Sequence, residues 1–302
     1  MSEEKSILSP AVAEINELTY ALKERMWFEN LGVNLPVIRS GRDILELTRW
    51  EGKPAIVIGA GQSVQRFNHL ELLAKSNLQN FLVIATDRML VSCLKKGITP
   101  DLVVSSDGDP IIAKFYNDPI VPKYKDRVKA VFNEIVHPKT VKKCPYEKYF
   151  YISLKDDPTE KKSITRIIHW MLKKTMMPSL GNSGADSWNI GLFLGASPMI
   201  IVGIDYSYPP DTPLEKTIYY KAYVDLAQKT GKKLEDFYGV ITNPQSGEKL
   251  MIDYNWNAYA RIFMHYAEKT PVETWNCSPI SSLYGERVKY VPLEEALRRF
   301  KG

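Results

Sequence analysis

Short apolar runs alternate with helix-like stretches through the middle of the chain. From Lys53 onward the runs are apolar throughout rather than alternating, as in strands that are covered on both faces: AIVIG, FLVIAT, DLVVSS, KAVFN, YFYISL and MIIVGI. Helical patterns such as DRMLVSCLKKG and ADSWNIGLFLGA lie between them, and the first ends with Gly97 in a usual C-cap position. This alternation predicts a doubly wound, mostly parallel, Rossmann-like α/β sheet.

The two ends of the chain depart from this alternation. In the first fifty residues, Val12, Ile15, Leu18 and Leu22 have helical spacing, and GRDILELTRW gives a second short helical pattern. From Tyr206 the chain is rich in Tyr, Pro, Lys and Trp, before an apolar stretch, VKYVPL, and a closing helix, LEEALRRF. We therefore predict a helical N-terminal segment (1–52), a Rossmann-like nucleotide-binding core (53–205), and a lid or acceptor-side extension with a closing strand and helix (206–302).

Composition narrows the class of protein. The chain has 302 residues, 44% of them hydrophobic, enough for a full core, and Lys plus Arg exceed Asp plus Glu by 40 − 35 = 5. The basic residues are scattered, which argues against a nucleic-acid partner. No apolar run approaches the ~18 residues of a membrane span. Cys93, Cys144 and Cys277 are far apart, which fits a reducing compartment. These features predict a cytoplasmic protein without a membrane span, and they leave a homo-oligomer open.

The first candidate site is the glycine turn after the AIVIG strand. In an open parallel sheet, ligands bind beyond the carboxyl ends of the strands. Gly59 and Gly61, followed by Gln62 and Ser63, would let the backbone approach a phosphate closely. Val64 stands where a dinucleotide fingerprint needs a third glycine, and no Gly-Lys-Ser/Thr follows. The turn therefore predicts a nucleotide phosphate rather than NAD, against the alternative of a tight turn without a ligand.

Three carboxylates follow the next strands. Asp87 could bind a ribose hydroxyl or only cap the following helix. Asp107 and Asp109, in SSDGDP, could both catalyse and hold a Mg²⁺ ion that bridges phosphates, or they could belong to a local Asp-Gly turn. The sequence leaves these alternatives open.

Two further strand ends carry polar side chains. Asn182 and Ser183, in SLGNSGADSW, could contact a base, ribose or sugar, although Ser183 alone could cap the helix. Asp205, after MIIVGI, could bind a ribose or sugar hydroxyl, or it could be a structural carboxylate bonded to backbone N–H groups.

The four histidines form no zinc motif. His69, His137, His169 and His265 show neither H-x-H nor H-E-x-x-H spacing. His137, in NEIVHPK beyond the fourth strand, is placed where a ligand at the top of the sheet could reach it, whereas His265 suits ordinary helix packing.

Three segments that span roughly Lys53 to Tyr208 carry a resemblance when they are taken in order: AIVIGAGQSV, IATDRMLVSCLKKGITPDLVVSSDGDP and GNSGADSWNIGLFLGASPMIIVGIDYSY. Together they resemble the 6-hydroxymethylpterin diphosphokinase MptE-like family, which includes domains of the motility accessory factors. The resemblance implies a nucleotide-bearing donor on the Gly59 to Ser63 turn. It leaves two groups that could move: a pyrophosphoryl group from ATP to a pterin hydroxyl, or a sugar from a nucleotide donor.

The same segments are similar to bacterial sialyltransferases with a Rossmann-like fold. Their G-x-G-P-S turn matches Gly59 to Ser63 with Gln62 in place of Pro, and their Ser-Gly matches Ser183 and Gly184. Where those enzymes carry a catalytic histidine in the lid, this chain has Asp253 or Tyr254. The base is therefore not carried over, and Asp253 or His137 would have to serve.

We predict a transferase, with glycosyl transfer from a CMP-type sugar slightly favoured. Tyr206, Tyr208, Tyr254 and Trp256 would suit stacking on a sugar, or they could fill a core beneath the lid. Mg-dependent diphosphokinase activity is the alternative, and no organic cofactor beyond the nucleotide donor is expected. The partners would be a nucleotide or nucleotide sugar and a small-molecule or glycan acceptor. A non-catalytic nucleotide-binding protein and an NAD-dependent oxidoreductase are the hypotheses from other classes.

Overall fold

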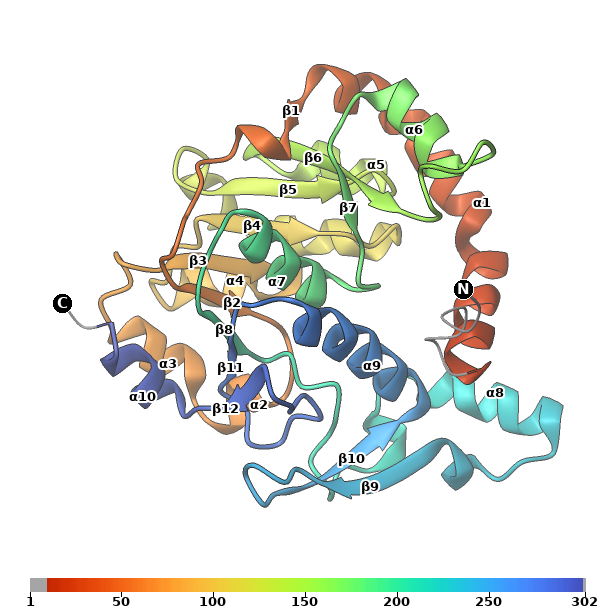
Figure 1. The fold of residues 1–302 in the computed structure, drawn as a ribbon, viewed down its shortest axis with the longest axis vertical. Helices are drawn as coiled ribbons and strands as arrows, with labels where there is room; N and C mark the ends of the chain where they lie inside the picture. Colours follow the sequence, from red (N-terminus) through yellow and green to blue (C-terminus); the bar gives the residue numbers. More distant parts are fainter. Residues whose placement is uncertain (1–9, 301–302) are drawn as a thin grey trace.

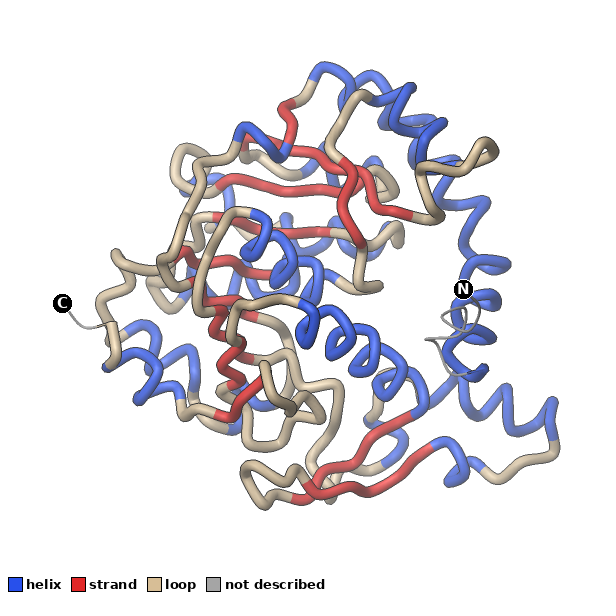
Figure 2. Tube along the Cα trace, in the orientation of Figure 1, coloured by secondary structure: helices blue, strands red, loops and turns tan. Residues whose placement is uncertain are grey.

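The computed structural model describes residues 10–300, with side chains from Lys23 onward. Figure 1 shows the fold, and Figure 2 shows helices packed around a central group of strands. The strands are β1 (Arg42–Asp43), β2 (Ala55–Ile58), β3 (Leu82–Thr86), β4 (Leu102–Ser105), β5 (Lys129–Asn133), β6 (Glu147–Leu154), β7 (Met176–Pro178), β8 (Met199–Val202), β9 (Tyr238–Thr242), β10 (Lys249–Asp253), β11 (Thr274–Asn276) and β12 (Val288–Tyr290). The α-helices are α1 (Pro10–Ser40), α2 (Ser63–Arg66), α3 (His69–Ala74), α4 (Asp87–Lys95), α5 (Pro138–Lys143), α6 (Ile164–Leu172), α7 (Ser183–Phe193), α8 (Tyr220–Thr230), α9 (Tyr254–Lys269) and α10 (Leu293–Arg298). Short 3-10 turns are η1 (Ile44–Glu46), η2 (Pro110–Tyr116), η3 (Val121–Tyr124), η4 (Leu214–Lys216) and η5 (Leu234–Phe237).

The main sheet confirms the predicted α/β class. Within the described residues it has ten strands in the order β1-β6-β5-β4-β3-β2-β8-β11-β12, with β7 beside β6, and all these pairs are parallel. The chain leaves β2 toward β3 on one side and returns to β8 on the other. The carboxyl ends of the paired strands β2 and β8 are therefore the topological switch point, beyond which this class of sheet places its ligands.

Alternate residues of the strands face two different cores. Val57, Ile84 and Val104 pack with Trp188 of α7 and Phe263 of α9. The residues between them face the other side, where α3, α4, α5 and α10 lie, as in the cluster of Ile56, Val83, Cys93 and Leu297. Burial on both faces explains why these strands are apolar throughout.

The N-terminal segment differs in part from the sequence prediction. The helix is present as α1, but it continues through Pro36 to Ser40. The prediction of a second short helix is wrong. Arg42 and Asp43 form β1, which pairs with β6, and the single turn η1 follows. Gly41 permits this, because a Cβ there would overlap the Phe150 ring. The side chains of Val12, Ile15, Leu18 and Leu22 lie outside the described residues.

Residues 206–302 contribute to the sheet as well as to a lid. The hairpin β9–β10 forms its own two-stranded antiparallel sheet, and α8 and α9 lie beside it (Figure 1). The predicted closing strand and helix are β12 and α10, and β11 joins β8 to β12. Two strands of the main sheet, β11 and β12, thus come after the lid in the sequence.

Candidate functional site

The glycine turn after β2 is shaped by a second turn after β8. A Cβ on Gly59 would overlap the Gly203 carbonyl, and a Cβ on Gly203 would overlap that of Gly59. A Cβ on Gly61 would overlap the Asp205 carboxylate. The two glycines of the motif are therefore required by the close approach of two loops at the switch point, whether or not a phosphate also binds.

Asp205 ties the two turns together. One of its carboxylate oxygens accepts a bond from the Ser63 N–H at 2.9 Å, and the other accepts from the Ser63 hydroxyl at 2.7 Å. Burial raises the pKa of Asp205, and the Ser63 bonds oppose that rise. In this structure, Asp205 therefore holds the turn after β2 against the turn after β8 through its bonds with Ser63. Gln62 is exposed at the tip of the turn, where its side chain makes no capping bond.

The turn before α7 reaches the end of β4. The Ser183 hydroxyl lies 3.1 Å from that of Ser106 and 3.2 Å from the Ser106 backbone nitrogen. Asn182, rather than Ser183, is the N-cap of α7, because its side-chain oxygen accepts from the Ala185 N–H at 3.1 Å. Gly184 follows within the first turn of α7, where a Cβ would lie 3.2 Å from the Asn182 side-chain oxygen. The three predicted contact residues therefore lie at a helix N-terminus that faces the sheet edge.

Tyr206 fixes the position of that helix start. Its hydroxyl lies 3.0 Å from the Asn182 side-chain nitrogen and 3.1 Å from its oxygen, and its ring is within 5.5 Å of the Trp256 ring. The backbone of Tyr206 has a φ of 46°, in the left-handed region that such a residue rarely adopts. Backbone strain of this kind is typical of residues that are held in place at a functional site.

Asp87 and Asp107 follow the adjacent strands β3 and β4. Asp87 is 4% exposed, and its Oδ1 accepts from the Arg88 N–H at 2.6 Å. Its Oδ2 is buried, and the Ser105 hydroxyl is the side chain of the described part of the chain that acts on this carboxylate as a hydrogen-bond donor. Burial chiefly, and the Asp107 charge in addition, raise the pKa of Asp87 to about 7, whereas the bonds from Ser105 and the Arg88 N–H oppose that rise. A buried carboxyl group with a raised pKa at a strand end is typical of functional sites.

Asp109 and His137 lie together, farther along the edge. Asp109 is the N-cap of η2, its Oδ1 accepting from the Ile111 N–H at 2.8 Å, and Asp107 accepts from the Asp109 N–H at 3.0 Å. His137 caps α5 through Nδ1, which accepts from the Lys139 N–H at 3.1 Å. Burial lowers the pKa of His137, with Lys139 acting in the same direction and Asp109 against it. Since Nδ1 is occupied, the neutral ring carries its proton on Nε2 and has no free lone pair for a base.

Asp253 is enclosed within the lid. It is 1% exposed, and its oxygens accept from the hydroxyls of Tyr208 and Tyr223 at 2.9 and 3.1 Å and from the Trp256 N–H at 2.8 Å. Burial raises its pKa. Asp253 therefore links β10 to α8 and caps α9. These bonds stabilise the lid and occupy the oxygens that a catalytic base would use.

Several residues at this edge were not found from the sequence. Asn133, the last residue of β5, has a buried side-chain oxygen without a partner in the described chain, and Ser278, after β11, has a buried hydroxyl that acts on the Asp205 carboxylate. Glu134 is fully buried and pairs with Lys155 at 2.7 Å, beyond the ends of β5 and β6. The strand-end rule applied to KAVFN and YFYISL would have found Asn133, Glu134 and Lys155. The sequence offered no such signal for Tyr259, whose ring packs against Gly181.

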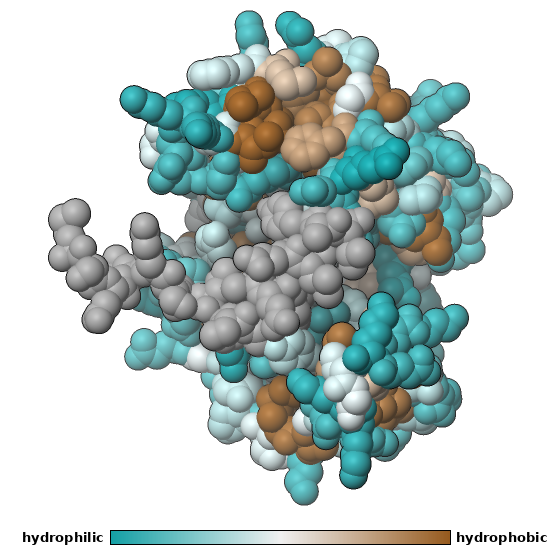
Figure 3. Space-filling view, turned by 90° about the vertical axis from the view of Figure 1, so that its right-hand side faces the viewer, coloured by the Kyte–Doolittle hydropathy of each residue, from teal (hydrophilic) through white to brown (hydrophobic). Residues whose placement is uncertain are grey.

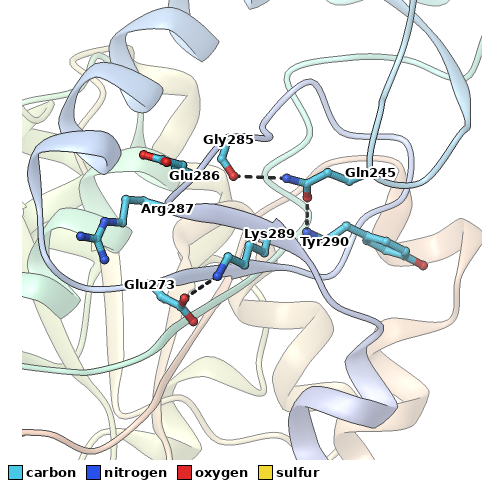
Figure 4. A pocket seen from close by; sticks show the side chains of 7 residues that line it. All are labelled: Gln245, Glu273, Gly285, Glu286, Arg287, Lys289 and Tyr290. Atoms are coloured by element: carbon cyan, nitrogen blue, oxygen red, sulfur yellow. Dashed lines mark hydrogen bonds and ion pairs between the residues drawn. The ribbon is translucent and has the colours of Figure 1, made fainter.

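Two hollows lie away from the glycine turn. One of about 260 Å³ is enclosed by α1, α6 and the loops after β5 and β6, with Trp27, Leu31, Ile135 and Lys155 among its walls. The other, of about 770 Å³, follows edge strand β12 (Figure 4). There the Gln245 amide donates to the carbonyls of Gly285 and Val288 and accepts from the Tyr290 N–H, so that it occupies the hydrogen-bonding positions of a further strand. This larger hollow thus lies along a sheet edge whose backbone groups are bonded by Gln245, and it is not part of the site.

The described residues contain no group of three or more His, Cys, Asp or Glu side chains arranged to hold a metal ion. Nor does any described helix have the length and apolar character to cross a bilayer.

Comparison with known proteins agrees with the observed fold. A Maf glycosyltransferase from Magnetospirillum magneticum AMB-1 has a similar fold, with a TM-score of 0.53 at 13% sequence identity. The match covers 89% of this chain but 38% of that one, so the chain spans well under half the length of this neighbour. Among curated proteins, none matches the chain in sequence.

A sequence model of one protein family matches residues 29–211, more than half of the chain. That interval includes the glycine turn, the two strand-end carboxylates Asp87 and Asp107, and the start of α7. The chain belongs to the 6-hydroxymethylpterin diphosphokinase MptE-like family.

Proposed function

We propose that this protein is a transferase that binds a nucleotide donor at the switch point between β2 and β8. The observation that supports this most directly is the row of polar groups at adjacent strand ends, with the buried Asp87 after β3, next to the strand that leads into the glycine turn. The start of α7 adds a helix N-terminus that favours anions. Asp87, Asn182 and Ser183 would contact the nucleoside, and the turn from Gly59 to Ser63 would face its phosphates.

We favour glycosyl transfer from a CMP-type sugar, with a small molecule or glycan as the acceptor. A fold shared with a glycosyltransferase and the ring cluster of Tyr206, Trp256 and Tyr259 under the lid support this choice. The acceptor hydroxyl would have to lose its proton to a nearby base. Asp253 and His137, the two predicted bases, are each engaged in hydrogen bonds in this structure, so either would have to release a partner to accept that proton.

Mg-dependent transfer of a pyrophosphoryl group from ATP to a hydroxymethylpterin is the second candidate. The position of Asp87 and Asp107 after adjacent strands favours it, because two carboxylates and the phosphate oxygens of a substrate are a typical Mg²⁺ ligand set. Asp107, with Asp109 behind it, would hold the ion and neutralise phosphate charge, and no organic cofactor beyond the nucleotide would be needed. A non-catalytic nucleotide-binding protein would share the donor site but neither reaction.

The test is thermal unfolding in the presence of CMP, CDP, UDP, GDP, ATP and NAD, each with and without Mg²⁺. A ligand that binds only the folded state at 100 times its Kd adds roughly 2.7 kcal/mol of stability. We expect CMP to raise Tm without Mg²⁺. A rise with ATP that requires Mg²⁺ and is lost in Asp107→Asn would favour pyrophosphoryl transfer instead, and a response to NAD alone would favour an oxidoreductase.

A matched variant keeps this test specific. Asp87→Asn should abolish the stabilisation by nucleotide, whereas Asp126→Asn, at an exposed position outside the site, should leave it unchanged. If no nucleotide raises Tm, both transferase proposals fail. Binding without turnover of any nucleotide sugar or ATP would leave the non-catalytic alternative.

A further inference from the structure

The loop that carries Asp107 is held by side chains rather than by the sheet. β4 ends at Ser105, which pairs with Phe132 of β5, so residues 106–109 lie beyond the ladder of hydrogen bonds between these strands. Buried backbone groups that leave a sheet need other hydrogen-bond partners. Two buried asparagines, from different parts of the chain, supply them here.

Asn133 and Asn30 bond to the carbonyls on either side of Asp107. The side-chain nitrogen of Asn133, at the end of β5, donates to the Ser106 carbonyl at 3.1 Å. The side-chain nitrogen of Asn30, on α1, donates to the Gly108 carbonyl at 2.9 Å. Asn133 and Asn30 are 2% and 5% exposed, whereas Asp107 is partly exposed. Because a peptide unit is planar, the two bonds fix the unit before Asp107 and the unit after Gly108. The backbone from which the Asp107 carboxylate projects is therefore held at both ends.

Gly108 allows α1 to approach this loop. A Cβ on Gly108 would lie 2.9 Å from the Trp27 ring and 3.1 Å from the Asn30 side-chain nitrogen, closer than side chains usually approach. The backbone of Gly108 is not in the left-handed region, so this crowding, rather than the shape of the turn, explains the glycine. The Asp-Gly pair in SSDGDP thus reflects the contact with α1.

α1 also bonds to the loop after β5. The Asn30 side-chain nitrogen donates to the Ile135 carbonyl at 3.0 Å, and Asn34, one turn later, donates to the Val136 carbonyl at 2.7 Å. The arrow of β5 in Figure 1 points to the right-hand side of the molecule, where α1 lies, and Figure 3 shows the molecule from that side. α1 therefore passes the carboxyl ends of β4 and β5. Asn30 bonds to both loops, whereas Asn34 bonds to the second loop.

We propose that Asn30 and Asn133 are positioning residues that hold the backbone around Asp107 and so set where its carboxylate meets the donor. Their amides are uncharged and bond to backbone carbonyls, so they do not neutralise the carboxylate. A Lys or Arg side chain in their place would pair with Asp107 and compete with a ligand for its charge. The proposal rests on the proposed function in one respect, that a nucleotide donor is the ligand that Asp107 meets.

The first test is hydrogen exchange of the free protein, measured by mass spectrometry. Asn30→Leu and Asn133→Leu keep the approximate size of the side chain and remove the donor. We expect exchange in peptides that cover residues 106–112 to become about tenfold faster in each variant, because a buried carbonyl that loses its partner favours local opening. Asn133→Leu also removes a buried oxygen without a partner in the described chain, so we expect it to fold even if Asn30→Leu does not.

Asn34→Leu is the matched control for this test. It removes a buried bond between α1 and the Val136 carbonyl but leaves both carbonyls beside Asp107 paired. Exchange of residues 106–112 should be unchanged in this variant. Equally faster exchange in Asn34→Leu would mean that the loop responds to the docking of α1 as a whole. That result, or unchanged exchange in Asn133→Leu, overturns the proposal.

The second test asks whether holding the loop matters to the ligand. Thermal unfolding is titrated with CMP, and with ATP plus Mg²⁺. The nucleotide that stabilises the unchanged chain should bind about tenfold more weakly to Asn30→Leu and to Asn133→Leu, and equally well to Asn34→Leu. If the asparagines act through Asp107, neither substitution should weaken binding further when Asp107→Asn is already present.

The outcomes separate this proposal from the proposed function. An additive loss of affinity in the double variants, or full affinity in both asparagine variants, would overturn the positioning role. If no nucleotide stabilises the unchanged chain, the proposed function fails, and hydrogen exchange still decides whether Asn30 and Asn133 hold the loop.

Discussion

At the scale of single residues, burial decides what each candidate side chain can do. Asp205 was predicted either to contact a ribose or sugar or to have a structural role, and in the structure it bonds to Ser63 across the switch point. Asp253 is similarly engaged by two tyrosines and a helix N-terminus. Asp87 differs because burial raises its pKa to about 7 in spite of the bonds from Ser105 and the Arg88 N–H. A sequence gives the residue type at a strand end but not whether its bonds are already taken.

Asp87 should make the stability of the protein depend on pH in a defined direction. Its pKa of about 7 in the folded state is above the ordinary ~3.9, so folding favours the protonated form. Its contribution to stability is complete below about pH 4 and is lost as pH rises through 7. Asp87→Asn cannot ionise, and we expect the fall in Tm between pH 5 and pH 8 to be smaller in this variant by several degrees.

The measurement is thermal unfolding at both pH values, followed by circular dichroism. Asp126→Asn, in an exposed position, serves as the control and should retain the pH dependence of the unchanged chain. An equal fall in Tm for Asp87→Asn would mean that burial does not hold the Asp87 proton.

At the scale of elements, the predicted strands and helices of the core are confirmed, and the errors concern how segments pair. All six apolar runs form strands, and DRMLVSCLKKG forms α4, followed by Gly97 with a φ of 79°. GRDILELTRW was predicted as helical because its apolar residues have helical spacing. Its first residues instead bond to β6, a partner more than a hundred residues away, and no local pattern carries that information.

The lid is an element held together by one carboxylate. Asp253→Asn keeps the size of the side chain but removes the charge that strengthens the bonds from Tyr208 and Tyr223. We expect a cost of about 1–3 kcal/mol, confined to the lid. Hydrogen exchange should then show faster exchange in β9, β10 and the start of α9, with β2 to β5 still protected.

Asp225→Asn provides the comparison on the same lid, because Asp225 is exposed on α8 and should leave exchange unchanged. Loss of transferase activity in Asp253→Asn with an unaltered exchange pattern would contradict the structural role and restore Asp253 as a candidate base.

At the scale of the whole molecule, the sheet joins parts of the chain that the sequence separated. β1, from the predicted N-terminal segment, lies at one end, and β11 and β12, from the predicted lid segment, lie at the other. The core cluster on the α3–α10 side includes Trp275, Cys277, Leu293 and Leu297 beside residues of β2 and β3. The boundaries at residues 52 and 205 remain predictions about function rather than about independent folding.

A shortened chain tests this unity. A chain that ends at Thr270 lacks β11, β12 and α10, which leaves β8 as a sheet edge and exposes its buried side chains. We expect it to show no cooperative unfolding transition by calorimetry. Lys232→Gly/Lys233→Gly, in an exposed turn of the full chain, should unfold as the unchanged protein does. Cooperative unfolding of the shortened chain would show that residues up to 270 fold independently.

The sequence by itself determined the class of the sheet and the edge at which to look for a site. Continuous apolar runs are required by burial on both faces, and glycines and carboxylates at strand ends mark the edge where the chain turns. Only the tertiary structure decided why the glycines of GAGQS are needed, since they meet Gly203 and Asp205 of a turn that is over 140 residues away. It also decided which carboxylates are free, because a hydrogen-bond partner is set by the fold and not by neighbours in the sequence.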